Sequence, residues 1–305
     1  MSSRISRRQF IQTAGLGAVG GAGVALTEKS NEGRTPASLA QMPRLLVGCC
    51  AYSFLKYLDA GKMTMEGFIL KGVAMGVNGL DMTTYWLKST DSDYLLSLRH
   101  LAFKEGMPFS GAACRAGLLQ PDDAKRREVV EEIKTWVDRT DVLGASHLRV
   151  FAGKLPAGAT PAQGVDWTVE SMKAACDYAA KKGITLGVET HSGITQKADI
   201  TLEILRRVDS PYAGITLDIT HFISDSDEDL YKQIEACIPY ATQTHIRDHF
   251  DNHHPIDLDR IWQMFARAGY KGYMSLEYQG REDALIAAPN LVQRMKALSK
   301  KYSSV

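Results

Sequence analysis

The sequence lacks the features of several protein classes. It has only five cysteines, an odd number without a regular spacing, which argues against a disulfide-stabilised scaffold. We expect these cysteines to be buried as small apolar residues. Beyond residue 40, no apolar run approaches the roughly 20 residues that a membrane-spanning helix needs. No glycine-rich dinucleotide-binding motif follows the first apolar run, where Gly48 precedes Cys49 and Cys50.

The sequence also has little net charge. It contains 36 Lys and Arg and 35 Asp and Glu, and without residues 1–40 the numbers are 31 and 33. The basic residues form no clustered stripe along the chain. A strong positive field is what attracts a phosphate backbone, so we do not expect a nucleic-acid partner.

The N-terminus resembles a targeting segment. Arg7 and Arg8 precede a weakly apolar, glycine-rich stretch at 13–26, which is typical of a twin-arginine export signal. A tail or an uncleaved anchor is the alternative, and cleavage after Ala40 would suit the small residues there. We therefore expect an export signal and linker over 1–40, a periplasmic or extracytoplasmic protein without a stable membrane span, and one domain over 41–305.

The remaining 265 residues alternate strand-length apolar runs with segments of helical period. Such alternation predicts a parallel sheet covered by helices. Eight strands and eight helices in a chain of this length favour the α/β class and a (β/α)8 TIM barrel, which typically takes about 250 residues. The predicted strands are 45–49, 78–82, 108–113, 147–151, 184–189, 214–218, 242–246 and 272–277. The predicted helices are 64–75, 91–105, 123–143, 165–182, 199–208, 228–237, 257–268 and 283–299.

Residues that favour helix ends lie at the junctions of these segments. A glycine follows five of the predicted helices, where only glycine adopts the left-handed conformation at low cost. An aspartate precedes four predicted helices, where its carboxylate can accept hydrogen bonds from free backbone amides. The glycines are Gly76, Gly106, Gly144, Gly183 and Gly269, and the aspartates are Asp91, Asp166, Asp199 and Asp257.

Ligand-type residues end the last four predicted strands. They are Glu189, Asp218, His245 and Glu277. In a TIM barrel the carboxyl ends of the strands meet at one face, so we expect these side chains to converge. Each residue alone has an ordinary explanation as a solvated, capping or core side chain, but four in consecutive strands predict one shared metal site. Oxygen ligands with one imidazole suit Mn²⁺, Mg²⁺ or Co²⁺, and Zn²⁺ can also bind such a set.

Other polar residues near these strand ends are candidates for substrate binding. His221 and His191 would lie just above the metal, where each could bind a substrate hydroxyl or orient a carboxylate ligand. Arg149 could contact substrate or form a buried ion pair, and Lys154 could contact substrate or be solvated. Arg247, two residues after His245, is a further candidate.

The motifs GVETHSG, TLDITHF, THIRD and SLEYQG resemble the xylose-isomerase-like TIM barrel superfamily, in particular its sugar phosphate isomerase/epimerase family. The similarity extends over essentially all of 41–305, including GCCAYSF and LRVFAGK. The resemblance implies that Glu189, Asp218, His245 and Glu277 bind one divalent metal ion. It also implies that Glu189 and Glu277 transfer protons and that His221 contacts substrate.

The expected activity is that of a metal-dependent sugar isomerase or epimerase in carbohydrate metabolism. One carboxylate removes the proton α to a carbonyl, and the metal stabilises the resulting enediolate. Thr195 and Asp251 stand where the ketose 3-epimerases of this superfamily carry Glu and Arg. These differences argue against simple epimerisation of a free ketose. The alternatives are a lyase acting on a 3-keto-sugar or keto-glycoside through the same enediolate, and a non-catalytic sugar-binding barrel. An exported enzyme should meet unphosphorylated sugars, and the chain could form a homo-oligomer.

Overall fold

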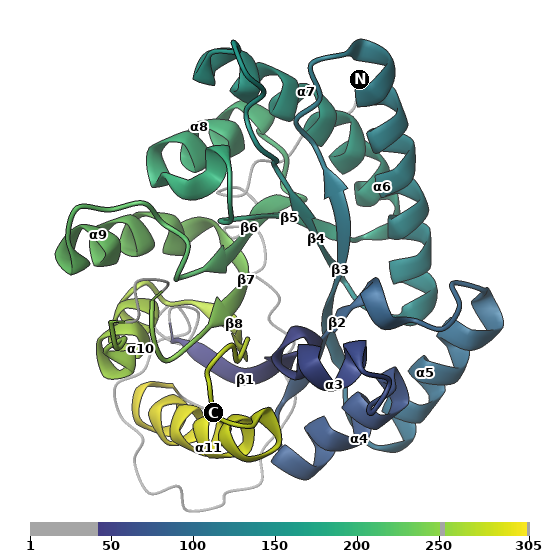
Figure 1. Cartoon of the computed structure of the whole chain (residues 1–305), viewed down its shortest axis with the longest axis vertical. Coiled ribbons are helices and arrows are strands. Elements are labelled where there is room, and N and C mark those ends of the chain that lie inside the picture. The colour runs from purple at the N-terminus through teal and green to yellow at the C-terminus, as the bar shows by residue number, and fades with distance from the viewer. Residues whose placement is uncertain (1–41, 251–253, 304–305) are drawn as a thin grey trace, which may run out of the picture. The chain divides into compact units, whose positions relative to one another are not determined.

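Among the described residues, eight parallel strands close into a barrel in which each strand pairs with its sequence neighbours and β8 pairs with β1 (Figure 1). The structure is a computed structural model and describes residues 42–250 and 254–303. The predicted export signal, cleavage point and linker in residues 1–40 lie outside the described residues. The strands are β1 Arg44–Cys50, β2 Gly79–Thr83, β3 Phe109–Gly117, β4 His147–Phe151, β5 Thr185–Glu189, β6 Ala213–Asp218, β7 Ala241–Ile246 and β8 Lys271–Leu276.

Helices surround the barrel and connect its strands, so the predicted α/β TIM barrel is confirmed (Figure 1). The α-helices are α3 Leu55–Asp59, α4 Met65–Met75, α5 Ser92–Lys104, α6 Asp123–Leu143, α7 Pro161–Ala179, α8 Ala198–Val208, α9 Asp227–Cys237, α10 Leu258–Arg267 and α11 Ala284–Tyr302. Short 3-10 helices occur at η1 Ala51–Phe54, η2 Thr84–Trp86, η3 Ala180–Lys182, η4 Ile194–Gln196 and η5 Ile238–Tyr240.

The predicted glycine junctions are confirmed, because all five glycines have positive φ angles between 65° and 86°. The aspartates fit less well. Asp257 caps α10 by accepting a hydrogen bond from the Arg260 amide, whereas Asp91 occupies the N-cap position of α5 without a side-chain hydrogen bond. Asp166 and Asp199 were wrongly predicted to precede helices, since they lie inside α7 and α8.

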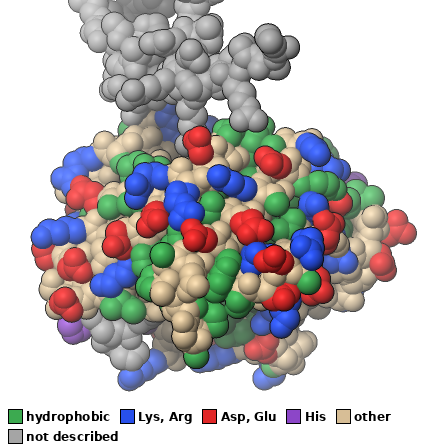
Figure 2. Space-filling view, turned by 90° about the horizontal axis from the view of Figure 1, so that it is seen from above, with side chains coloured by type: hydrophobic (Ala, Val, Ile, Leu, Met, Phe, Trp, Pro, Cys, Tyr) green, Lys and Arg blue, Asp and Glu red, His purple; other side chains and the backbone are tan. Residues whose placement is uncertain are grey.

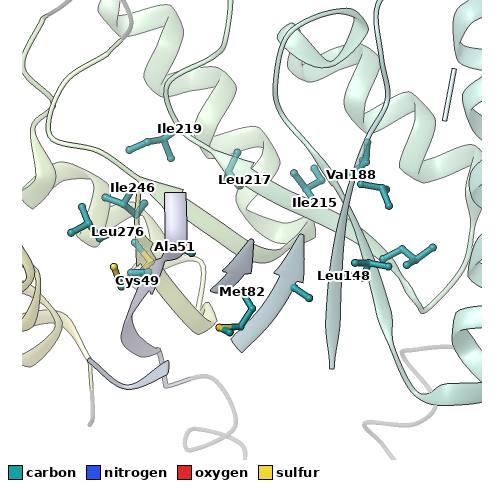
Figure 3. Close-up of a cluster of buried hydrophobic side chains, with 14 of the residues drawn as sticks. Cys49, Ala51, Met82, Leu148, Val188, Ile215, Leu217, Ile219, Ile246 and Leu276 are labelled. Atoms are coloured by element: carbon teal, nitrogen blue, oxygen red, sulfur yellow. The ribbon is translucent and has the colours of Figure 1, made fainter. Parts of the chain in front are cut away.

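Apolar side chains fill the space between the barrel and the helices. Residues alternate along each strand, so in β6 Ile215 and Leu217 belong to the apolar cluster while Asp218 takes the other orientation. Figure 3 shows Ile215, Leu217, Val188 and Leu148 in this cluster. All five cysteines are buried and unpaired, as predicted. Packing on the helix side leaves the opposite side of each strand available for polar groups.

Polar residues occupy the interior of the barrel and leave no room for side chains at some positions. A Cβ at Gly187 would lie 2.4 Å from His147 Nε2 and 2.5 Å from Thr216 Oγ1. The His147 ring is buried and its Nε2 lies 3.1 Å from Thr242 Oγ1. On β5, β6 and β7, Gly187, Thr216 and Thr242 precede Glu189, Asp218 and His245 along the chain, so this polar layer lies beneath the strand ends that carry the candidate site.

Candidate metal centre and active site

The four predicted ligands come together in the structure. Glu189 and Asp218 are the last residues of β5 and β6, His245 is the penultimate residue of β7, and Glu277 directly follows β8. One ligand atom from each lies within 4.8 Å of those of the others, and all four residues are buried. Their convergence on one site is therefore observed, while their binding of a metal stays a prediction.

His245 is the centre of this cluster. Its Nδ1 lies 2.9 Å from Glu189 Oε1 and 2.7 Å from Glu277 Oε2. Its Nε2 lies 3.0 Å from Asp81 Oδ2, on the other side of the ring. Burial lowers the pKa of His245, but the nearby Glu277 carboxylate, with Cys50 and Asp81, raises it well above 6.5. The imidazole therefore sits between carboxylates on both of its nitrogen atoms.

Two arginines bind the carboxylates of the cluster. Arg149 Nε lies 3.1 Å from Glu189 Oε2. Arg247 donates to Asp218 Oδ2 and to Glu277 Oε1, both at 3.1 Å. Burial raises the pKa values of Glu189 and Glu277, but Arg149 and His245 lower that of Glu189, and His245 and Arg247 lower that of Glu277, so that both pKa values fall below the ordinary one. Both groups are therefore held as carboxylates.

The charges and donor atoms of this group fit a divalent cation. Three buried carboxylates, of Glu189, Asp218 and Glu277, contact the guanidinium groups of the two arginines, and a fourth, of Asp81, contacts the His245 ring. The raised pKa of His245 makes the ring an imidazolium in the metal-free site. A divalent cation that displaces this proton would balance the two negative charges that the group then carries. Glu189 Oε2 is also buried and, apart from its ion pair with Arg149 Nε, accepts no hydrogen bond from the described residues. A carboxylate oxygen can accept from more than one partner, so a bound ion could contact this atom as well.

Asp81 was not predicted as a site residue. It lies in the middle of β2, is 1% exposed and contacts His245 directly. The signal in the sequence is a carboxylate inside an apolar strand, in the run Gly79-Leu80-Asp81-Met82. An aspartate is buried in such a strand only when it has a partner. Cys50, Asp81 and His245 also form a compact group that could hold a metal. Burial and the Asp81 carboxylate raise the pKa of the Cys50 thiol, so this second group is the poorer cation site.

Both loop histidines lie at the site. His221 Nε2 is 3.4 Å from Asp218 Oδ2 and 3.1 Å from the Arg247 guanidinium. The His191 ring contacts the His221 ring edge-on, with centroids 4.4 Å apart, and lies 4.9 Å from the Phe151 ring. Burial lowers the pKa of His191. Both histidines line the cavity described next. His221 also contacts the Asp218 carboxylate, which fits its second predicted role, whereas the contacts of His191 are with Ser192, His221 and Phe151.

A cavity of about 470 Å³ opens onto these groups. This volume falls within the roughly 300–1,000 Å³ of small-molecule sites. Of the predicted substrate contacts, Arg149, Arg247, His191 and His221 line the cavity. Lys154 is exposed and does not line it, so its contact with substrate stays a prediction. The other lining residues are Cys50, Tyr52, Tyr85, Arg115, Phe151, Glu189, Glu277 and Gln279.

Of the two alternatives predicted for Arg149, the buried ion pair is observed, while its contact with substrate stays a prediction. It forms the buried ion pair with Glu189, and it donates to the Cys114 carbonyl at 2.8 Å and to the Tyr85 hydroxyl at 3.0 Å. Thr195, which stands where the ketose 3-epimerases have Glu, is buried and donates to the Glu189 carbonyl at 2.8 Å. It supplies no further carboxylate, and Asp251 lies outside the described residues.

A closed parallel barrel with buried carboxylates and an imidazole at one mouth defines a class of TIM-barrel proteins with a candidate metal centre. The chain belongs to the xylose isomerase-like TIM barrel family, whose model matches residues 70–301. No curated protein matches the sequence significantly. Family membership confirms the resemblance inferred from the strand-end motifs.

Solved structures share this fold at low sequence identity. D-allulose 3-epimerase from Methylomonas sp. is 18% identical with a TM-score of 0.68, over 84% of this chain and 99% of that one. The 3-keto-D-glucoside 4-epimerase from E. coli is 13% identical with a TM-score of 0.67, over 84% and 99%. The IolI protein, solved with a bound zinc atom, is 17% identical with a TM-score of 0.68, over 85% and 100%. At these identities the likeness establishes the fold alone.

The surface charge and the length and polarity of the helices bear on nucleic-acid and membrane partners. On the face drawn in Figure 2, positive and negative side chains are interspersed without a patch of one sign. Within 42–250 and 254–303, every helix is too short or too polar to cross a bilayer.

Proposed function

We propose that this chain is a divalent-metal-dependent isomerase or epimerase that moves a proton on the carbon next to the carbonyl of a small sugar. The observation that carries the proposal is the convergence of Glu189, Asp218, His245 and Glu277 beside one cavity. The sugar epimerases among the similar structures, and the zinc atom in another, support it. A set of mostly oxygen ligands suits Mn²⁺, Mg²⁺ or Co²⁺, and Zn²⁺ is compatible with it.

The proton is exchanged between substrate and two carboxylates. A divalent cation bound by the four residues would supply Lewis acidity, which makes the carbon next to a carbonyl easier to deprotonate. Glu189 and Glu277 reach the site from β5 and from the end of β8, and their lowered pKa values keep them ionised. As carboxylates they are the groups that would accept the proton. Return of the proton to the neighbouring carbon isomerises the sugar, and return to the opposite face epimerises it.

The surrounding side chains would bind the rest of the sugar. His191, His221 and Arg247 line the cavity and carry nitrogen atoms that can bind hydroxyls or a carbonyl oxygen. Arg149 and Arg247 also hold Glu189 and Glu277 in place, which keeps the proton-transfer groups oriented.

We further propose that the substrate is an unphosphorylated sugar or keto-sugar. The twin-arginine motif at Arg7 and Arg8 would direct the folded protein out of the cytoplasm. Phosphorylated sugars are scarce outside the cytoplasm. Fractionation of cells that express the full chain tests the location. Turnover of a phosphorylated sugar, without turnover of free or oxidised sugars, would contradict this substrate class.

A lyase that starts with the same proton removal is the second candidate. It is favoured by Thr195, which leaves the site without the further carboxylate that ketose 3-epimerases carry at this place. In a lyase the electrons left by the departing proton expel a substituent from the next carbon instead of recapturing a proton. Exchange of substrate hydrogen for deuterium without loss of a leaving group separates the isomerase from the lyase.

Metal analysis and proton exchange test the proposal directly. We expect about one divalent ion per chain and, by NMR in D₂O, metal-dependent exchange on at least one free ketose or keto-sugar of a panel. Glu277→Gln should slow exchange by about 10²–10⁴-fold because a general base is lost. Glu235→Gln, on the exposed face of α9, is the matched control and should leave exchange unchanged.

Two other results would contradict the proposed function. A protein purified without metal that shows no exchange under any metal contradicts the enzymatic proposal. If Glu277→Gln retains sugar binding and the wild-type protein never exchanges a proton, the chain is a non-catalytic sugar-binding barrel.

A further inference from the structure

A second cavity lies beside the one that opens onto the candidate metal centre. Its volume is about 540 Å³, so it is large enough to hold a small ligand of its own. It lies between the segment after β1, which includes η1 and α3, and the loop that leads from β8 into α11. Its lining residues are Tyr52, Ser53, Leu55, Lys56, Tyr57, Lys62, Tyr278, Gln279, Gly280, Arg281, Glu282, Asp283 and Ala284.

The two cavities share Tyr52 and Gln279, so they meet along these side chains. Gln279 donates from its Nε2 to Glu277 Oε1 at 2.6 Å. The boundary between the cavities is therefore one hydrogen bond away from a predicted proton-transfer group. Tyr52 is partly exposed, and its ring lies 5.8 Å from the Trp86 ring. A ligand that reacts at the metal centre could extend past these two residues without leaving the protein.

Hydrogen bonds hold the walls of the second cavity in place. Ser53 Oγ donates to the Leu276 carbonyl at 3.0 Å and accepts from the Tyr278 amide at 2.9 Å, which fixes η1 to the end of β8. The Tyr57 hydroxyl lies 2.7 Å from both carboxylate oxygens of Asp283, the N-cap of α11. Both contacts join segments more than 220 residues apart in the sequence. A cavity with such walls is formed before the ligand arrives, which reduces the entropy lost on binding.

The chemistry of this lining suits a sugar ring. Tyr52, Tyr57 and Tyr278 provide aromatic surface and hydroxyl groups. The charged groups are of mixed sign, with Lys56, Lys62 and Arg281 against Glu282 and Asp283, and Asp283 already accepts a hydrogen bond. Aromatic faces and scattered hydrogen-bonding groups without a strong excess of one charge favour a neutral polyhydroxylated ring over a phosphate group.

We propose that the second cavity binds a second sugar ring, and that the substrate is therefore a glycoside or disaccharide whose reacting ring lies at the metal centre. The inference rests on the proposed function, because it places the reacting carbonyl in the first cavity. It adds a substrate class that the metal centre alone does not define.

Filling the second cavity tests the proposal. Ala284 is the first residue of α11 and lines the cavity, so Ala284→Trp would place an indole ring there. Ala124, exposed in the first turn of α6 and in neither cavity lining, provides the matched control Ala124→Trp. Exchange in D₂O is measured on 3-keto-glucose and on the 3-keto derivatives of cellobiose, maltose and trehalose, with the metal-loaded protein.

We expect the wild-type protein to use at least one keto-disaccharide with kcat/KM about 10-fold or more above that of 3-keto-glucose. Ala284→Trp should remove this preference by raising KM for the disaccharide, with 3-keto-glucose unchanged. Tyr57→Ala should weaken the preference in the same way, and Ala124→Trp should not.

Three results overturn the inference. They are an equal or better kcat/KM for 3-keto-glucose, an equal effect of Ala284→Trp on both substrate sizes, and exchange on free ketoses without exchange on any keto-disaccharide. The proposed function survives all three. Its own failure is recognised separately, as the absence of metal-dependent exchange on every sugar, and in that case the inference falls with it.

Discussion

Asp81 reaches the imidazole ring of His245 from the side opposite to Glu189 and Glu277. A carboxylate that accepts the second ring N–H of a metal-binding histidine fixes the ring orientation and the tautomer that leaves the other nitrogen free. In this barrel, the carboxylate belongs to β2 and the histidine to β7, so the contact crosses the interior. Asp81 is thus a positioning residue for the proposed metal ligand.

Replacement of Asp81 by Asn should lower the affinity for divalent metal by about 10–100-fold, because the amide orients His245 less strongly. Calorimetric titration of the metal-free protein with Mn²⁺ measures the change. Asp177→Asn, on the exposed face of α7, serves as control and should bind Mn²⁺ like the wild type. An unchanged affinity in Asp81→Asn would show that the contact does not position the ligand.

His147 should make stability depend on pH. Burial lowers its pKa from 6.5 to about 4. As the pH falls, His147 therefore binds a proton near pH 6.5 in the unfolded chain but only near pH 4 in the folded protein. The stabilising contribution is complete above pH 6.5 and is lost as the pH falls toward 4, by about 2 kcal/mol at pH 5.

The comparison of wild type with His147→Gln isolates this effect, because the other titrating groups are common to both. Denaturant unfolding at pH 7 and pH 5 should show a fall in the free energy of unfolding that is about 2 kcal/mol larger for the wild type than for the variant. Equal falls in the two proteins would mean that His147 is not held neutral in the folded state.

Residues at strand ends were predictable, whereas Asp81 was not. Glu189, Asp218, His245 and Glu277 follow apolar runs, and the barrel topology brings such positions to one face. Asp81 lies inside the apolar run of β2. The alternation of side chains along a strand does not show which residue across the barrel pairs with this buried carboxylate. That information depends on the relative positions of β2 and β7.

At the scale of elements, α7 shows how a local signal can be misread. The helix was predicted from 165, but it begins at Pro161, because Thr160 and Gln163 form a reciprocal capping box. Pro161 lies in the first turn, where its missing amide costs nothing. Asp166 therefore lies within the helix, where it forms an ion pair with Arg207 at 2.6 Å. The threonine and proline carried the start signal, and the aspartate did not.

Thr160→Ala should reduce the free energy of unfolding by about 1 kcal/mol, since the helix loses its N-cap. Asp166→Ala should change it by less than about 0.5 kcal/mol, because its ion pair is on the surface. Chemical denaturation of both variants measures the two values. A larger effect for Asp166 than for Thr160 would contradict the observed start of α7.

At the scale of the whole molecule, the proposed metal links strands that are distant in the sequence. A cation held jointly by β5, β6, β7 and the end of β8 binds only the closed barrel, so it should stabilise the folded state. At a free metal concentration 100 times the Kd, linkage adds about 2.7 kcal/mol. Chelation should therefore lower the thermal midpoint of the wild type, and Asp218→Asn should show a much smaller metal-dependent shift.

The closed topology was predictable because the number of strands, their continuous apolar character and the glycines between elements all agree with a TIM barrel. The short segment η1–α3 and the second cavity beside it were not predicted. They arise from contacts such as Ser53 with Leu276 and Tyr57 with Asp283, which join the two ends of the domain. The pattern of apolar and polar residues within one segment does not predict contacts between segments so far apart in the sequence.

A crystal structure of the Mn²⁺-loaded protein, with anomalous diffraction data at the manganese edge, tests the shared metal site most directly. We expect one strong peak in the barrel, surrounded by Glu189, Asp218, His245 and Glu277, with Asp81 still hydrogen-bonded to the far side of the His245 ring. A barrel without a peak, or a peak bound by other residues, would contradict it.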